Sequence, residues 1–144
     1  MQIKTNSKEI EEYLGDRMEI HHIGIVVKDI YKSIDIYNKL GYSVESEICN
    51  DQIQNNRIVF MKSEDGRLRI ELIEPMNKAS SISNFPEGYH HICYDVSNDE
   101  DFLKHFHKLK IGKIFTKPII APAIDSKKVV FAFLRNNSFA EFIL

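Results

Sequence analysis

The stretch H-I-G-I-V-V-K-D at residues 22–29 returns in altered form as H-I-C-Y-D-V-S-N at residues 91–98. Each copy is followed by a glutamate in an apolar run. Glu71 in R-I-E-L-I-E stands 49 residues after the first histidine, and Glu141 in F-A-E-F-I-L stands 50 residues after the second. Repetition at a fixed spacing is typical of duplicated structural units. We therefore expect two half-domains, each supplying one histidine and one glutamate to a shared metal site.

The first half has the pattern of a strand, a helix and three further strands. Alternating and β-branched residues at 19–27 predict a strand, and apolar residues at helical spacing from Asp29 predict a helix that ends at Gly41. Further strand patterns follow, with Glu64-Asp65-Gly66 as a hairpin turn. These strand patterns cover residues 43–49, 57–62 and 67–73.

The second half repeats this order. A strand is expected at 90–96 and a helix at 99–110, whose apolar face ends before Gly112. Three more strands are expected at 113–115, 128–134 and 138–144. Each half therefore reads βαβββ, which predicts an α+β fold.

Three segments have no place in the repeat. Residues 1–18 form an N-terminal extension, in which Lys8 to Leu14 has the pattern of a short helix. Pro75 to Pro86 is rich in Ser, Asn and Pro and is expected to link the halves, while Pro118 to Lys127 is a second long loop. The remaining chain, 19–144, is expected to be one domain of two modules, at about 19–78 and 88–144.

Strand alternation predicts which way the histidines and glutamates point. His22 shares a face with Gly24, whereas His21 should point the opposite way. If the first and last strands of both halves are adjacent, His22, Glu71, His91 and Glu141 can converge on one point. A carboxylate in such an apolar strand is costly to bury unless it is paired or bound to a metal. Glu74, beside Pro75 at a strand end, is interpreted as a solvated carboxylate.

Composition excludes several classes of function. The chain has 144 residues and a net charge of −2, with a pI near 6.3. It is therefore long enough for one domain and lacks the basic excess that nucleic acids or anionic membranes require. Since no apolar run approaches the roughly 20 residues of a membrane span and the start lacks a signal peptide, we expect a cytoplasmic protein. Cys49 and Cys93 are interpreted as reduced thiols.

Other polar clusters have simpler interpretations. His105 and His107 lie two apart on the expected helix, on different faces, which favours a solvated surface over a metal site. Cys93 shares the face of His91 and is a weak candidate ligand, because small buried cysteines usually fill space. Phosphate-binding glycine loops and the G-x-S-x-G nucleophile motif are absent from the sequence.

The repeated motifs resemble the vicinal oxygen chelate superfamily, which includes glyoxalase I, methylmalonyl-CoA epimerase, extradiol dioxygenases, and fosfomycin and bleomycin resistance proteins. The resemblance rests on H-I-G-I-V-V, I-E-L-I-E-P, G-Y-H-H-I-C-Y-D-V and the terminal E-F-I-L, and it covers residues 18–144. It implies a curved mixed sheet around a metal-binding cleft. H-H-I-G-I-V-V-K-D, E-L-I-E-P-M-N-K-A-S-S-I and E-G-Y-H-H-I are most similar to the epimerase branch, whose linker region helps to hold a coenzyme A ester.

Carried over to this chain, the resemblance implies that His22, Glu71, His91 and Glu141 are the metal ligands. Two imidazoles and two carboxylates suit an octahedral divalent cobalt, nickel, manganese, iron or zinc ion with two waters. Such a site can stabilise an enolate after proton loss beside a carbonyl. Glu141 is then the expected base, with Glu71 opposite it, an arrangement suited to epimerisation or isomerisation. The family commonly forms homodimers, which are expected here.

Two segments depart from the epimerase pattern and leave alternatives open. Epimerases of the family usually carry a loop with glycine and histidine where this chain has I-I-A-P-A-I-D-S-K-K, and a His-Pro turn where it has R-N-N-S. The leading hypothesis is an epimerase or isomerase acting on an acyl thioester such as methylmalonyl-CoA. The alternatives are a glyoxalase I-like lyase acting on hemithioacetals, and a binding or resistance protein that holds a small molecule without turnover. The extra Glu71 disfavours extradiol dioxygenases and fosfomycin enzymes, which normally use two histidines and one glutamate.

Overall fold

The computed structural model describes residues 14–144. Its helical elements are the 3₁₀ turns η1 (Gly15–Arg17) and η2 (Pro122–Ile124) and the α-helices α2 (Ile30–Lys39) and α3 (Phe102–Leu109). Its strands are β1 (Glu19–Val26), β2 (Ser43–Val44), β3 (Cys49–Asp51), β4 (Asn56–Lys62), β5 (Arg69–Pro75), β6 (Gly88–Asp95), β7 (Gly112–Ile114), β8 (Ile119–Ala121), β9 (Lys127–Leu134) and β10 (Phe139–Ile143). None of the helices in this described part is long and apolar enough to cross a membrane.

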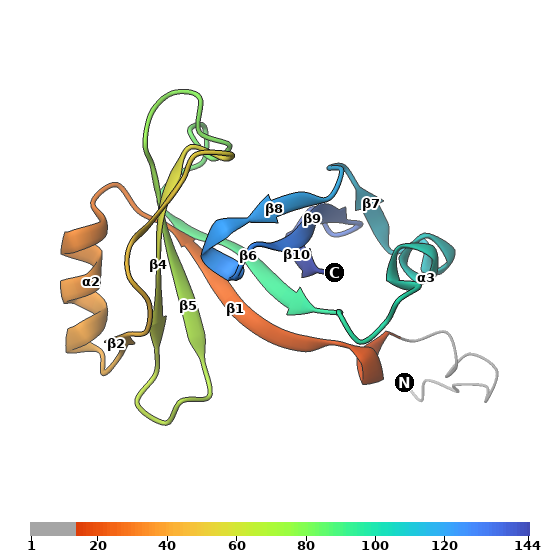
Figure 1. Ribbon diagram of the computed structural model, residues 1–144, viewed down its shortest axis with the longest axis horizontal. Coiled ribbons are helices and arrows are strands. Elements are labelled where there is room, and N and C mark those ends of the chain that lie inside the picture. The colour runs from red at the N-terminus through yellow and green to blue at the C-terminus, as the bar shows by residue number, and fades with distance from the viewer. Residues whose placement is uncertain (1–13) are drawn as a thin grey trace.

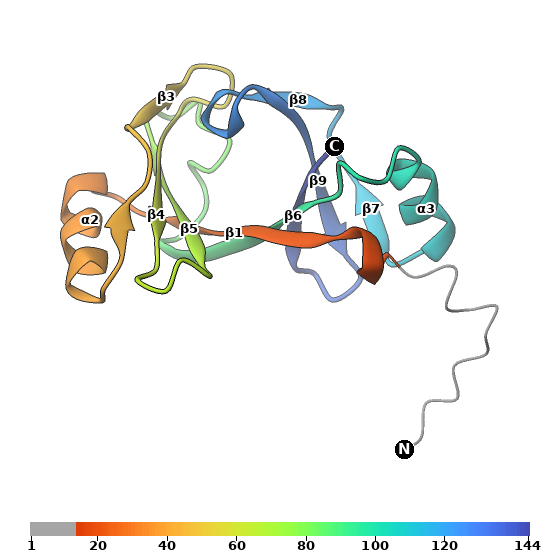
Figure 2. The same ribbon diagram turned by 60° about the horizontal axis from the view of Figure 1, so that its bottom comes forward.

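All the strands belong to one mixed sheet with the order β2-β4-β5-β1-β6-β10-β9-β7, to which β3 and β8 add at β4 and β9. At the centre, β1 and β6 are antiparallel, and each pairs in parallel with the last strand of its own half, β5 or β10. The condition for convergence, that the first and last strands be adjacent, is therefore met. The sheet curves, so that β3 and the chain after β8 approach each other over its concave side (Figure 2).

The two helices lie at opposite ends of the sheet (Figure 1). Asp29 begins α2, because its carboxylate accepts a hydrogen bond from the Lys32 amide at 3.0 Å. The buried side chain of Ile30 packs with apolar residues of β4 and β5. In the second half, Phe102 and Phe106 of α3 pack around Phe142 of β10. Both amphipathic helices thus pack at the outer ends of the sheet, away from its centre.

The structure confirms the α+β fold class but changes some element boundaries. The expected strand at 43–49 is divided into β2 and β3, and the expected loop at 118–127 contains β8 and η2. Of the expected helix at 8–14, residues 8–13 lie outside the described residues. The division into an extension at 1–18 and two modules stays a prediction.

Glu74 corrects the interpretation of a solvated carboxylate. Its Oε2 accepts the backbone N–H of Ile30 at 2.7 Å, and its Oε1 accepts Nη1 of Arg57 at 2.9 Å. The side chain is only 14% exposed. Because the first N–H groups of a helix have no partner within the helix, a carboxylate there satisfies one of them and complements the helix dipole. Glu74 therefore joins the end of β5 to the start of α2.

Candidate metal centre

The four side chains expected to bind a metal come from four neighbouring strands at the centre of the sheet. Glu71 lies on β5, His22 on β1, His91 on β6 and Glu141 on β10. Gly24 of β1 is the register partner of both Glu71 and His91, one on each side. The structure therefore brings together residues that are far apart in the sequence.

The ligand atoms of these side chains converge on one small volume. Nε2 of His22 lies 3.1 Å from Nε2 of His91, and 3.5 Å from both Oε1 of Glu71 and Oε2 of Glu141. Nε2 of His91 lies 2.8 Å from Oε2 of Glu141 and 3.8 Å from Oε1 of Glu71. Ligand atoms from all four residues lie within 4.8 Å of one another. The two imidazoles thus present the same ring nitrogen to the same point.

Burial makes this cluster electrostatically demanding. His22 is 0% exposed, and Glu141 is 3% exposed. Burial alone would lower the pKa of His22, but the charge of Glu71 and hydrogen bonds with Cys93 and Glu141 raise the pKa well above its usual value of 6.5. Burial would raise the pKa of Glu141, but hydrogen bonds from His22 and His91 lower that pKa to about 2. The ionised forms of His22 and Glu141 therefore stabilise each other in this buried cluster.

The donor set fits a divalent metal ion. Two ligand atoms at right angles around an ion, each about 2.1 Å from it, lie about 3 Å apart, and the two imidazole nitrogens are 3.1 Å apart. Two carboxylates balance a charge of +2, and mixed imidazole and carboxylate ligands suit first-row transition metals. The described chain therefore contains a candidate metal site at Glu71, His22, His91 and Glu141.

Gly24 makes room for one of these histidines. A β-carbon on Gly24 would overlap Cε1, Nδ1 and Nε2 of the His91 ring. The imidazole therefore lies directly on the backbone of β1, at a position that no larger residue can occupy without moving it. The glycine in H-I-G-I-V-V was the sequence signal for this close approach.

His21 does not point away from the site, which corrects the prediction from simple alternation. Its Nδ1 lies 2.7 Å from Nδ1 of His22. On β6, Nδ1 of His90 lies at the same distance, 2.7 Å, from Nδ1 of His91. The register of the β1–β6 ladder shifts at both places, and an extra residue in one strand breaks the alternation of faces. Strand alternation predicts neither contact, and the only trace of them in the sequence is the H-H doublet at 21–22 and at 90–91.

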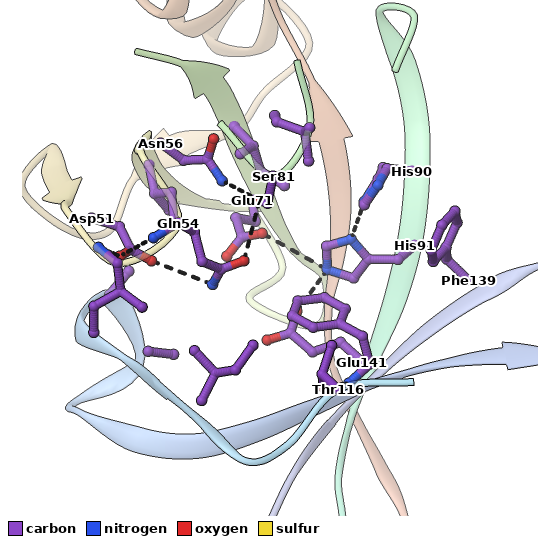
Figure 3. Close-up of a pocket in the computed structure, with 18 of the residues that line it drawn as sticks. Asp51, Gln54, Asn56, Glu71, Ser81, His90, His91, Thr116, Phe139 and Glu141 are labelled. Carbon is purple, nitrogen blue, oxygen red and sulfur yellow. Dashed lines mark hydrogen bonds and ion pairs between the residues drawn. The ribbon is translucent and has the colours of Figure 1, made fainter. Parts of the chain in front are cut away.

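Both glutamates open onto a cavity of about 410 Å³ on the concave side of the sheet. Figure 3 shows His91 between Glu71 and Glu141 at its inner end, and Asp51 and Gln54 on the far side. Five phenylalanines contribute to the wall: Phe85, Phe115, Phe131, Phe133 and Phe139. The linker 75–86 and the loop 118–127 both contribute wall residues, among them Ile82 and Ile124. The two segments outside the repeat therefore shape the cavity.

The weaker candidate residues do not line the cavity, although Cys93 lies close to His22. Cys93 is fully buried and does not line the cavity, and burial, together with the charge of Glu141, raises the pKa of its thiol to about 12. A thiol that stays protonated favours the space-filling interpretation. His107 is exposed, as expected, whereas Nδ1 of His105 contacts Oδ2 of Asp99 at 2.7 Å.

The fold is a curved mixed sheet with a candidate metal site at its centre, and comparison with known proteins shows its family. A family model described as the Glyoxalase/Bleomycin resistance protein/Dioxygenase superfamily matches residues 21–131. The chain belongs to this superfamily.

Individual relatives are more distant. The chain is 29% identical over 118 residues to the mitochondrial methylmalonyl-CoA epimerase of Dictyostelium discoideum, covering 78% of this chain and 69% of the relative. It is 28% identical over 100 residues to the human mitochondrial epimerase, covering 66% of this chain but only 56% of the relative. A solved structure of the methylmalonyl-CoA epimerase from Mycobacterium tuberculosis superposes with a TM-score of 0.72 at 18% identity, covering 86% of this chain and 85% of that one. This structural likeness shows a shared fold.

Proposed function

We propose that the chain is a metal-dependent epimerase or isomerase that moves a proton at the carbon next to the carbonyl of an acyl thioester. The observation that carries the proposal is the convergence of two imidazoles and two carboxylates within 4.8 Å, with both carboxylates lining one cavity. The names of the relatives, which are methylmalonyl-CoA epimerases, support a thioester substrate such as methylmalonyl-CoA.

The four converging residues, His22, Glu71, His91 and Glu141, are the proposed ligands of a divalent cobalt, nickel, manganese, iron or zinc ion. Such an ion would supply a Lewis acid for a carbonyl oxygen that gains negative charge when a neighbouring proton leaves. Glu71, His91 and Glu141 lie in the wall of a largely apolar cavity, where charge interactions are stronger than in water.

Glu141 is the proposed base that removes the proton. Because its pKa is about 2, its carboxylate is ionised at neutral pH and has an open proton site. Glu71 reaches the same volume from β5, on the opposite side of the two central strands from β10. Two carboxylates that approach from different strands suit a reaction in which a proton leaves one face of a planar carbon and returns to the other.

The cavity supports an acyl group as the buried part of the substrate. Its volume of about 410 Å³ lies toward the lower end of the range for small-molecule sites. Phenylalanine and isoleucine side chains dominate its wall, which favours a hydrocarbon portion near the reacting carbon. A thiol carrier such as coenzyme A would then extend through the opening.

A second candidate, a glyoxalase I-like lyase acting on a hemithioacetal, is favoured by one observation. Among the described residues that line the cavity, none is an arginine or a lysine. A free carboxylate on the substrate therefore finds no cationic side chain there, whereas a neutral hemithioacetal needs none. Both reactions use the same four donors and begin with the same proton removal.

We further propose that the protein is a cytoplasmic homodimer. Exposed apolar side chains on and just after α2, including Tyr31, Ile36 and Leu40, provide surface that a second copy would cover. Sedimentation of the purified chain distinguishes the dimer from the monomer.

Deuterium exchange tests the proposed reaction. The metal-loaded protein is incubated in D₂O with methylmalonyl-CoA and with acyl-CoA esters that lack the second carboxylate, and label at the carbon next to the thioester is measured. In parallel, hemithioacetals of methylglyoxal and phenylglyoxal with small thiols are offered, and thioester formation is followed. Incorporation of deuterium supports the epimerase, and thioester formation supports the lyase.

Two outcomes would contradict the proposal. Absence of both reactions in protein that retains its metal would favour a binding protein that holds a small molecule without turnover. Equal exchange by wild type and Glu141→Gln would remove Glu141 from its proposed role. His107→Gln is the matched control, because His107 is exposed and is not part of the cavity wall.

A further inference from the structure

Each histidine of the candidate metal site is preceded by a second histidine that contacts it. His21 meets His22, and His90 meets His91, through the Nδ1 atoms of both rings and at 2.7 Å in both cases. In the β1–β6 ladder the pairing skips one residue at each place, and the skipped residues are His21 on β1 and His90 on β6. Two bulges in the central strands therefore turn two extra imidazoles toward the metal site.

We propose that His21 and His90 are positioning residues for the metal ligands. Each accepts the Nδ1–H of the histidine that follows it, which leaves Nε2 of that histidine free of hydrogen and directed at the ion. This inference rests on the proposed metal site, although not on the reaction catalysed there.

The positions of the protons carry the argument. A contact between two Nδ1 atoms is a hydrogen bond only when one of them holds a proton. Nε2 of His22 and Nε2 of His91 face each other at 3.1 Å, and both must be unprotonated to bind a cation. A neutral imidazole without a proton on Nε2 carries it on Nδ1. His22 and His91 are therefore the donors, and His21 and His90 are the acceptors.

The surroundings of His90 fix the orientation of its ring. As an acceptor through Nδ1, His90 carries its proton on Nε2, and that nitrogen is buried without a hydrogen-bond partner among the described residues. Leaving a buried donor unpaired is unfavourable. Phe139 stacks on the ring at a centroid distance of 5.1 Å, and Phe85 packs against it edge to face at 4.7 Å. Packing thus holds the ring with its Nδ1 facing His91, while its Nε2 makes no hydrogen bond among the described residues.

The choice of imidazole also preserves the charge balance of the site. Metal-binding histidines usually donate their second nitrogen to a carboxylate, a carbonyl or water. Here two carboxylates, Glu71 and Glu141, already match the charge of a divalent ion. A neutral imidazole acceptor orients each ligand without adding a third or fourth negative charge to a buried cluster.

Metal affinity tests the proposal directly. The substitutions His21→Phe and His90→Phe keep an aromatic ring and remove the acceptor, whereas His90→Asn places an amide oxygen near the position of Nδ1. Co²⁺ binding is measured by calorimetric titration of the purified, chelator-treated 144-residue chains, and the unfolding midpoint is measured without metal. His107→Phe, at an exposed position on α3, is the matched control.

We expect His21→Phe and His90→Phe to weaken Co²⁺ binding by about 10–100-fold, while His90→Asn stays within about threefold of wild type. Wild-type affinity in both phenylalanine variants would overturn the proposal, as would His90→Asn binding as weakly as His90→Phe. Should His90→Phe fail to fold, the metal-free midpoint reveals it, and His21→Phe and His90→Asn decide the question. Wild-type protein that bound no Co²⁺ would overturn the metal site and this role together, whereas absence of epimerase activity would not affect the measured affinities.

Discussion

The imidazole of His91 on β6 packs directly against the backbone of Gly24 on β1, in the space that a β-carbon of residue 24 would fill. The two residues are register partners, and a β-carbon on Gly24 would overlap three atoms of the ring. The ring is buried and cannot move aside without leaving the candidate metal site. The lack of a side chain at Gly24 therefore lets His91 reach that site.

Gly24→Ala is predicted to displace His91 and to weaken Co²⁺ binding by about 10-fold or more, since the ligand can no longer reach the common point. Titration of the chelator-treated protein measures the effect. Gly15→Ala is the matched control, because a β-carbon there meets no described residue within 4 Å. Equal affinity in Gly24→Ala and wild type would show that the ring has room to move.

Glu141→Gln is predicted to reduce proton exchange by about 10²–10⁴-fold, the usual effect of losing a positioned base. The amide oxygen can still face the ion, so metal content should fall much less than the exchange rate. Deuterium incorporation and metal analysis of the same preparation measure both quantities. A loss of exchange that merely parallels the loss of metal would assign Glu141 to binding alone.

Metal loading is predicted to stabilise the fold. Because the four ligands lie on four separate strands, an ion can bind all of them only in the folded chain. At a free metal concentration 100 times the dissociation constant, the gain in unfolding free energy is about 2.7 kcal/mol. Urea unfolding with and without Zn²⁺ or Co²⁺ measures this gain, and His91→Ala should abolish it. An unchanged midpoint in the wild type would argue against the metal site.

The stability of the metal-free protein should be highest near pH 6.5. Burial, with the charge of the neighbouring metal-site histidine, lowers the pKa of both His21 and His90 from 6.5 to about 4. As the pH falls from 6.5 to 4, His21 and His90 bind protons in the unfolded chain but not in the folded chain. The free energy of unfolding therefore decreases in that window. His22 has a raised pKa, so its contribution is complete below pH 6.5 and is lost as the pH rises through that raised value.

Urea unfolding after chelation, repeated from pH 4 to pH 9, measures this profile. His90→Phe should flatten the acid side, because it removes one of the two groups that titrate between pH 6.5 and pH 4. An acid side equally steep in wild type and His90→Phe would contradict the assignment.

Glu74→Ala is predicted to destabilise the fold by about 1–2 kcal/mol, the usual cost of losing a helix cap. The substitution leaves the Ile30 amide and the Arg57 guanidinium without their shared acceptor. Chemical unfolding measures the loss. Asp35→Ala removes an exposed ion pair with Lys39 and should change stability by less than about 0.5 kcal/mol. Similar values for both variants would show that the partly buried position of Glu74 carries no extra stability.

The repeat in the sequence was sufficient to predict the fold class and the four residues that meet at the centre. Hydrophobic periodicity locates β1, α2, β6 and α3 within a few residues, because these elements each bury one regular face. The same reasoning failed for the loop at 118–127, where β8 forms by pairing with β9 rather than by any pattern of its own. It also failed for Glu74, whose partners lie 17 and 44 residues away.

The sequence by itself determined that each repeat contains one histidine and one glutamate in a strand, and that His22 shares a strand face with Gly24. Spacing and alternation are local properties of the chain, so they can be read without the fold. Only the tertiary structure decided that His21 and His90 turn toward the site, because a bulge depends on how β1 and β6 pair across the two halves. It also decided the shape of the cavity, which the linker and the loop at 118–127 build together. These contacts join segments that are far apart in the sequence, so they follow from packing and cannot be predicted from a local pattern of residues.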